Sequence, residues 1–200
     1  ASPTWASPGV NVAPVPTGVQ TAGAVSACQV KVIGPIPSGS TIQSVSLALY
    51  MSRTRTQDQA VTLHRALADW GEGSSNASGE EGAGAPATTG DATWTQRFYP
   101  STPWASAGGD FAASASASIT VGNATQYYTW TSAGMVADVQ AWLDGSASNY
   151  GWLVRSNENT TRVAKRFNSR TNSDATRRPT LTITFTPPVP TGACCAADGS

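Results

Sequence analysis

Apolar and polar residues alternate along much of this chain. Between Thr41 and Tyr50, Val45, Leu47 and Leu49 alternate with small or polar residues, and a period of two predicts a strand with one buried face. The same alternation recurs in short segments separated by Gly, Pro, Asn and Ser. These segments contain Val30 and Val32, then Val61, Leu63 and Arg65, Ile119 and Val121, Trp152 and Val154, and Leu181, Ile183 and Phe185. The pattern predicts an all-β fold, a jelly-roll-like antiparallel β-sandwich.

One segment has the period of a helix instead. Its apolar residues recur at the three- and four-residue spacing of a buried helical face, and Gly145 follows them; they are Met135, Val136, Val139, Trp142 and Leu143. We therefore predict a short amphipathic helix over about residues 134–144 that covers one end of the sandwich.

The chain divides into a sandwich domain and two extended ends. We assign residues 24–186 to the β-sandwich, 1–23 to an extended N-terminal segment and 187–200 to a tail containing Pro and Cys. Both ends are rich in Pro, Ala, Thr and Gly, and free termini of this kind are normally disordered. Since neither end has enough large apolar residues for a core of its own, we expect a neighbouring domain or another copy of the chain to hold them. Residues 71–90 lack any periodicity and predict a long loop.

Charge is sparse, which narrows the classes of partner. Charged residues make up 12% of the chain, the formal net charge is zero, and the basic residues are scattered, so we expect no nucleic-acid partner. No apolar run approaches the roughly 20 residues that span a bilayer. Ser and Thr together number 48, a surface typical of secreted proteins and also of O-glycosylated ones. We therefore expect an extracellular protein, secreted or on the cell surface.

Two kinds of covalent modification are readable in the sequence. Three sequons, at Asn76, Asn123 and Asn159, are glycosylation candidates, although about two would arise by chance in this composition. The three cysteines are Cys28, Cys194 and Cys195. Adjacent cysteines pair only in a strained ring, so one tail cysteine pairing with Cys28 is the favoured disulfide, with the third cysteine free or intermolecular. The alternative is three unpaired thiols.

Residues suited to catalysis are few. His64 is the only histidine and lies in a predicted strand, which favours a structural role over a base or metal ligand. Glu72, Asp91 and Asp110 would form a glycosidase pair only if two of them were held about 5 to 10 Å apart across a cleft. A structural calcium site using Asp91 and Asp110 is a weaker alternative to the capping of turns. We predict no enzyme activity and no cofactor.

A family resemblance covers about residues 35–186. It is carried by ordered blocks along the chain, namely Leu63–Ala66, Asp69–Gly73, Gly90–Trp94, Arg97–Tyr99, Trp104, Gly108–Phe111, Val136–Leu143, Asn149–Trp152, Ala164–Arg170 and Arg178–Leu181. In these blocks the chain resembles the DNRLRE-domain family of bacterial extracellular and cell-surface proteins. The resemblance implies a jelly-roll sandwich that serves as an accessory module, with carbohydrate binding known for some relatives and no catalytic residues.

The chain departs from the family at its first strands. The turn at residues 36–42 is present, but the strand before it, residues 24–33, is atypical and the opening strand has no clear counterpart. A sandwich short of one strand exposes an unpaired edge, which a donated strand would fill. We take residues 186–196, or the N-terminal segment with Val10, Val12 and Val15, as candidate donors to a neighbouring copy. Alternatively, residues 10–19 fold back as the chain's own first strand.

Two functions follow as expectations. The first is a non-enzymatic structural subunit of an extracellular fibre or surface matrix, in which head-to-tail strand exchange builds a homopolymer and Trp5 fills a pocket on the neighbour. The second is a carbohydrate-binding module of a larger secreted protein, because flat aromatic faces pack against sugar rings. Trp5 is the one tryptophan outside the sandwich; the other six are predicted core or loop anchors.

Overall fold

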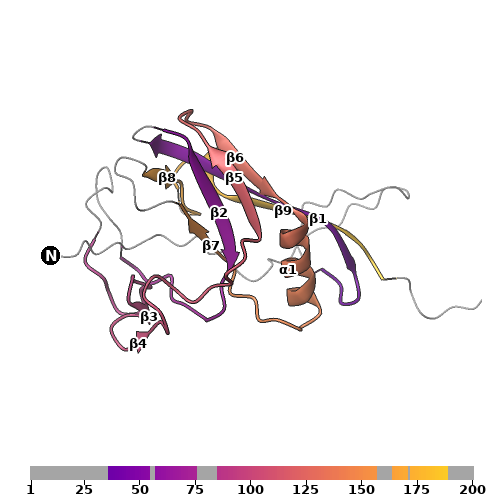
Figure 1. Ribbon diagram of the computed structural model, residues 1–200, viewed down its shortest axis with the longest axis horizontal. Helices are drawn as coiled ribbons and strands as arrows, with labels where there is room; N and C mark the ends of the chain where they lie inside the picture. Colours follow the sequence, from indigo (N-terminus) through magenta and orange to yellow (C-terminus); the bar gives the residue numbers. More distant parts are fainter. Residues whose placement is uncertain (1–35, 55–56, 76–84, 157–163, 171, 189–200) are drawn as a thin grey trace, which may run out of the picture.

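The computed structural model describes residues 36–54, 57–75, 85–156, 164–170 and 172–188. Within these ranges the chain is an all-β sandwich of two main antiparallel sheets, with a small two-stranded sheet and one α-helix (Figure 1). The elements are β1 (Thr41–Thr54), β2 (Gln59–Arg65), β3 (Gln96–Phe98), β4 (Thr102–Pro103), β5 (Ala117–Val121), β6 (Tyr127–Thr131), α1 (Ala133–Leu143), β7 (Trp152–Arg155), β8 (Lys165–Phe167), the 3₁₀ turn η1 (Ala175–Arg177) and β9 (Thr180–Thr186).

The first sheet is built around the long strand β1. Strand β6 pairs along one edge of β1, while β9 and then β8 follow each other along the other edge. Ser46 lies at the centre of the sheet, opposite Thr131 on β6 and Thr182 on β9. The predicted alternation is confirmed, since Val45, Leu47, Leu49 and Met51 are all buried.

The second sheet has the order β5, β2, β7. Val61 and Leu63 of β2 point into the core and are at most 1% exposed. Trp130 of β6 joins the two sheets, because its buried Nε1 donates a 2.9 Å hydrogen bond to the carbonyl of Val61. Its ring also meets Phe167 of β8 edge to face, at 5.8 Å between centroids. Fully burying each such apolar side chain contributes about 1.5 to 3 kcal/mol.

Helix α1 is one residue offset from the predicted range. Ser132 caps its N-terminus, where Oγ accepts from the Met135 amide, and Gly145 follows its last turn with φ of 69°. Met135 and Val139 bury the apolar face that the periodicity predicts. Trp142 packs against Trp152, with ring centroids 4.6 Å apart.

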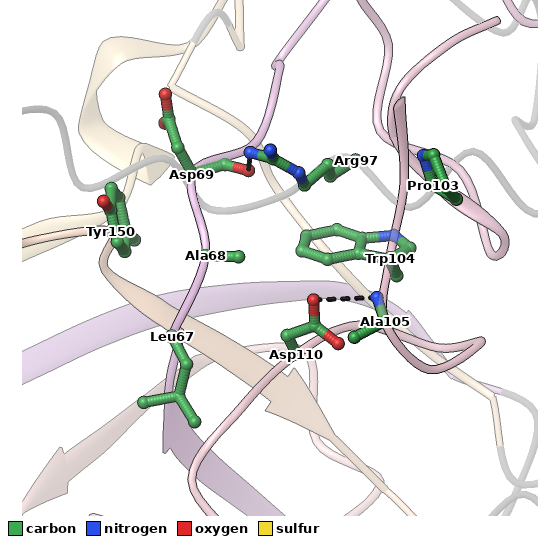
Figure 2. A pocket seen from close by; sticks show the side chains of 9 residues that line it. All are labelled: Leu67, Ala68, Asp69, Arg97, Pro103, Trp104, Ala105, Asp110 and Tyr150. Carbon is green, nitrogen blue, oxygen red and sulfur yellow. Dashed lines mark hydrogen bonds between the residues drawn. The ribbon is translucent and has the colours of Figure 1, made fainter. Parts of the chain in front are cut away.

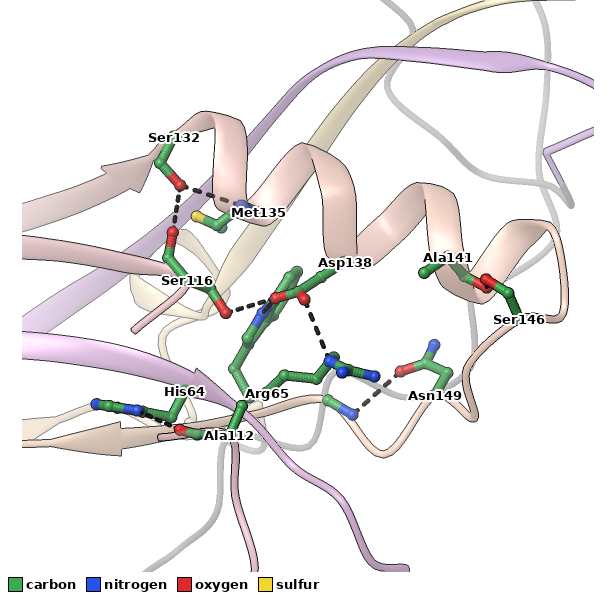
Figure 3. A network of polar contacts seen from close by, with 12 residues as sticks. His64, Arg65, Ala112, Ser116, Ser132, Met135, Asp138, Ala141, Ser146 and Asn149 are labelled. Atoms are coloured by element: carbon green, nitrogen blue, oxygen red, sulfur yellow. Dashed lines mark hydrogen bonds and ion pairs between the residues drawn. The ribbon is translucent and has the colours of Figure 1, made fainter. Parts of the chain in front are cut away.

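A polar network fastens α1 to the second sheet (Figure 3). Asp138 accepts hydrogen bonds from the Ser116 hydroxyl and the Trp152 indole nitrogen, and it lies 3.3 Å from Nε of Arg65. These partners lie at the end of β2, at the start of β7 and just before β5. A single carboxylate therefore holds the ends of three strands against the helix. The helix therefore braces both sheets, because it also packs on β1.

Some elements were not predicted from the sequence, and some predictions are not tested. Strands β6 and β8 were missed, as was the short pair β3 and β4, which follows the loop predicted over residues 71–90. The strand expected around Val30 and Val32 lies outside the described residues. The jelly-roll topology stays a prediction, whereas the all-β sandwich is confirmed.

Candidate functional site

Three loops meet at one end of the second sheet and enclose an open hollow. The backbone amide of Ala66 donates to Gly151, and that of Leu67 donates to Asp110, at 2.9 and 2.8 Å. These two hydrogen bonds hold three loops together: the loop that follows β2, the loop that precedes β5 and the loop that precedes β7. The hollow has a volume of about 520 Å³ and is lined by Leu67, Ala68, Asp69, Arg97, Pro103, Trp104, Ala105, Asp110 and Tyr150 (Figure 2).

A second, smaller hollow adjoins the first. It has a volume of about 270 Å³, and its walls include Leu67 and Tyr150 as well as residues 146–148, which follow α1. The two hollows lie next to each other, since both are lined by those two residues. We call the two hollows together the loop site.

Two large apolar side chains, Trp104 and Leu67, line the loop site beside its polar groups. The ring of Trp104 lies between the side chains of Arg97 and Asp110 (Figure 2), and its Nε1 donates to the Thr93 carbonyl at 2.9 Å. That hydrogen bond fixes the indole, which is half-buried and lines the hollow. Leu67 is 50% exposed on the opposite wall. An aliphatic and an aromatic side chain thus face the same opening.

Two charged side chains, Arg97 and Asp110, line the hollow with Trp104 and are held in place by hydrogen bonds. The two oxygens of Asp110 accept from the Ala105 and Ser106 amides, at 3.0 and 3.1 Å. Arg97 donates one hydrogen bond, from Nη1 to the Asp69 carbonyl at 3.1 Å. A guanidinium carries five N–H donors and each carboxylate oxygen two acceptor sites, so both side chains retain hydrogen-bonding capacity toward the loop site.

The buried carboxylate of Asp91 holds the loop that follows β2 through hydrogen bonds to its backbone. Asp91 is 1% exposed, and its oxygens accept from the amides of Ser74, Ser75 and Thr88 as well as the Thr88 hydroxyl. Burial raises the pKa of the Asp91 carboxyl, but the hydrogen bonds from Thr88, Ser75 and Ser74 outweigh it and hold the pKa below its usual value. The backbone of Asp91 also bonds Tyr99, which follows β3.

The carboxylates proposed as a catalytic or calcium-binding set are committed to separate tasks. Asp91 and Asp110 each hold a turn through backbone amides, and Glu72 forms a bidentate ion pair with Arg170 at 2.6 and 2.8 Å. No group of three or more His, Cys, Asp or Glu side chains suited to a metal ion occurs among the described residues. Of the predicted carboxylates, only Asp110 lines the loop site.

His64 is buried on the outer side of the second sheet and does not line the loop site, although its neighbour Arg65 does. Its Nδ1 donates to the Ala112 carbonyl at 2.8 Å, and its Nε2 lies 3.1 Å from the Thr62 hydroxyl. The ring also meets Phe111 edge to face. Both ring nitrogens therefore have partners within the chain.

Most other predicted site residues lie outside the described residues. These are the assembly residues Trp5, Val10, Val12 and Val15, the cysteines Cys28, Cys194 and Cys195, and the sequons at Asn76 and Asn159. Asn123 is described, and it is exposed in the turn between β5 and β6. In the described part of the chain, no helix has the length and apolar character needed to cross a membrane.

Comparison with other proteins gives no assignment. No protein-family model matches the sequence, and no curated protein or solved structure is significantly similar to it. The function therefore has to be argued from the loop site. Sequence reasoning missed Leu67, Asp69, Arg97 and Tyr150 as members of this site, although all four lie in or beside the blocks that carry the family resemblance.

Proposed function

We propose that this chain is a non-enzymatic extracellular module that binds carbohydrate in the loop site. The observation that carries the proposal is the half-buried indole of Trp104, which a hydrogen bond to Thr93 holds in an open hollow that Arg97 and Asp110 also line. The axial C–H groups of a pyranose ring pack on such a face, while side-chain donors and acceptors bind its hydroxyls. The resemblance to the DNRLRE-domain family supports the same role.

The chemistry of the loop site favours binding over catalysis. General acid and base groups act within hydrogen-bond reach of a substrate in a site from which water is excluded, whereas this hollow is open. Glycoside hydrolysis uses two carboxylates across a cleft. Here Glu72 is paired with Arg170, and Asp91 is buried behind the loops. Asp69 and Asp110 both line the hollow, and each accepts hydrogen bonds from backbone amides.

A matched pair of tryptophan variants tests the proposal. Trp104→Ala removes the proposed stacking surface, and Trp94→Ala removes a 50% exposed tryptophan that does not line the hollow. We expect a glycan array to identify a ligand for the wild-type chain. Trp104→Ala is expected to weaken binding tenfold or more, since a loss of about 1.4 kcal/mol is tenfold, while Trp94→Ala leaves the affinity unchanged. Equal losses in both variants, at unchanged melting temperatures, contradict the assignment.

A second role, self-assembly by strand exchange, is favoured by a different observation. Among the described residues, β5 and β7 each pair with β2 alone, so the second sheet has three strands against four in the first. An added strand along either edge would extend its backbone hydrogen bonding. Deletion of residues 1–20, followed by negative-stain imaging and sedimentation, tests the N-terminal donor. Filaments that persist after the deletion exclude that donor, and a monodisperse monomer of the full chain excludes the polymer.

A further inference from the structure

The ammonium group of Lys165 on β8 lies inside a set of four oxygen atoms. Its Nζ is 2.7 Å from the carbonyl oxygens of Gln57 and Gly122, 2.9 Å from Thr54 Oγ1 and 3.4 Å from Asn123 Oδ1. The two shortest distances are those of charge-assisted hydrogen bonds. We call these four oxygens the oxygen cage. They come from the end of β1, the turn after it and the β5–β6 turn, so Lys165 ties three segments together.

The backbone around the oxygen cage is arranged to present oxygen. Gln57 has φ of 71°, the one positive value among the described residues other than glycine. A left-handed conformation costs a residue with a Cβ about 1 kcal/mol or more, and here the turn that contains it directs the Gln57 carbonyl at the ammonium. Gly122 supplies the second carbonyl, and a Cβ at its position would lie 3.3 Å from Asp58 Oδ1.

Asp58 places negative charge beside the oxygen cage. Burial lowers the pKa of Lys165, and the carboxylate of Asp58 acts in the opposite direction. Two backbone carbonyls, a side-chain amide oxygen, a hydroxyl and a nearby carboxylate are together the ligand types of a calcium site, in which Ca²⁺ takes six to eight oxygens at about 2.3 to 2.6 Å. The oxygen cage offers four such oxygens, with the ammonium among them.

We propose that the oxygen cage is a divalent-cation site that the chain fills with its own Lys165 ammonium. The lysine supplies the positive charge that joins the β5–β6 turn to β1 and β8, so this end of the sandwich is fixed without a bound metal. When the side chain is shortened, the same oxygens bind Ca²⁺, with water completing the coordination shell.

Thermal unfolding of three purified full-length proteins, each in EDTA and in calcium, tests the proposal. The calcium concentration is about 10 mM, above the roughly 10⁻⁴ to 10⁻³ M dissociation constants of weak extracellular sites. Lys165→Ala empties the cage, whereas Lys165→Met removes the charge but keeps a long side chain in it. At a ratio of calcium to dissociation constant of about ten, the melting temperature of Lys165→Ala rises by about 3 to 6 °C. Wild type and Lys165→Met do not respond.

Several outcomes decide the matter. A wild-type melting temperature that falls in EDTA overturns the proposal, as does a Lys165→Ala variant that melts at the same temperature in both buffers. The proposal is supported if Lys165→Ala refolds only in calcium. It is wrong if Lys165→Ala refolds in neither buffer while Lys165→Met folds. Magnesium, which demands a smaller octahedral shell, is expected to give a smaller shift. Asp58→Asn in the Lys165→Ala background is expected to weaken calcium binding.

Discussion

Replacing Asp91 by asparagine perturbs the support of the loop site without changing its lining. Asparagine has nearly the same shape, but its amide places an NH₂ group where one carboxylate oxygen stood. In the wild type each carboxylate oxygen accepts from a backbone amide, with Ser74 N at 2.9 Å from Oδ1 and Thr88 N at 2.6 Å from Oδ2. Whichever way the new amide turns, one of these backbone donors faces another donor.

The expected loss follows from the number and burial of these bonds. A hydrogen bond to a charged group contributes about 1.5 to 3 kcal/mol, and a buried donor left without a partner costs about 1 to 3 kcal/mol. For a site that is 1% exposed, we expect Asp91→Asn to lower the free energy of unfolding by about 2 to 4 kcal/mol. At roughly 2 to 4 °C per kcal/mol for a chain of this size, the melting temperature falls by roughly 5 to 15 °C.

Differential scanning calorimetry measures this loss, with Asp174→Asn as the control. Asp174 also accepts a hydrogen bond from a backbone amide, that of Thr176, but it is exposed at the N-cap of η1, so we expect a much smaller fall in melting temperature. Loss of equal size in both variants, or no loss in Asp91→Asn, refutes the argument that burial and multiple amide donors make Asp91 important.

The same carboxylate predicts a pH dependence. Because the folded-state pKa of Asp91 lies below its ordinary value of 3.8, its stabilisation is fully present above that pH. It is lost as the pH falls from 3.8 through the lower folded-state pKa. We therefore expect the free energies of unfolding of wild type and Asp91→Asn to differ at about pH 5, and the difference to become smaller as the pH falls to about 2. A constant difference contradicts this assignment.

Three further substitutions test individual parts of the fold by thermal or denaturant unfolding. Gly73→Ala places a Cβ against the Asp91 carboxylate at a backbone φ of 65°, and we expect a loss of at least 1 kcal/mol; wild-type stability contradicts this. Ser132→Ala removes the cap of α1 and is expected to cost about 1 kcal/mol, an expectation that an unchanged midpoint refutes. Asp138→Ala leaves the Trp152 indole nitrogen without its partner, and we expect a loss of about 2 to 4 kcal/mol; a loss below that of Ser132→Ala counts against the network.

The sheets were predictable where one face of a strand is buried. In β1 the inward positions hold Val45, Leu47 and Leu49, and the outward positions are mostly small or polar. The alternation in the sequence therefore predicts this strand and its buried face. In β8 the three residues Lys165–Phe167 carry no alternation, and pairing with the far end of β1 decides their structure. In β6, the exposed Tyr127 beside the buried Tyr128 obscures the alternation.

The loop site could be predicted only in part. Trp104 and Asp110 stand out in the sequence as an aromatic and a carboxylate, but Leu67 and Tyr150 do not. Their position depends on backbone hydrogen bonds between loops far apart in the chain, such as Leu67 to Asp110. No local periodicity encodes such bonds. The roles of Asp91 as a support and of Lys165 as an internal cation likewise depend on tertiary contacts that spacing does not reveal.

The central claim is that carbohydrate binds in the loop site, and chemical-shift mapping with the glycan found on the array tests it most directly. We expect the indole N–H signal of Trp104 and the backbone amide signals of Leu67, Arg97 and Ala105 to shift on titration, while the indole signal of Trp130 in the core does not. Shifts confined to another face of the sandwich, with the Trp104 signal unmoved at saturation, would contradict it.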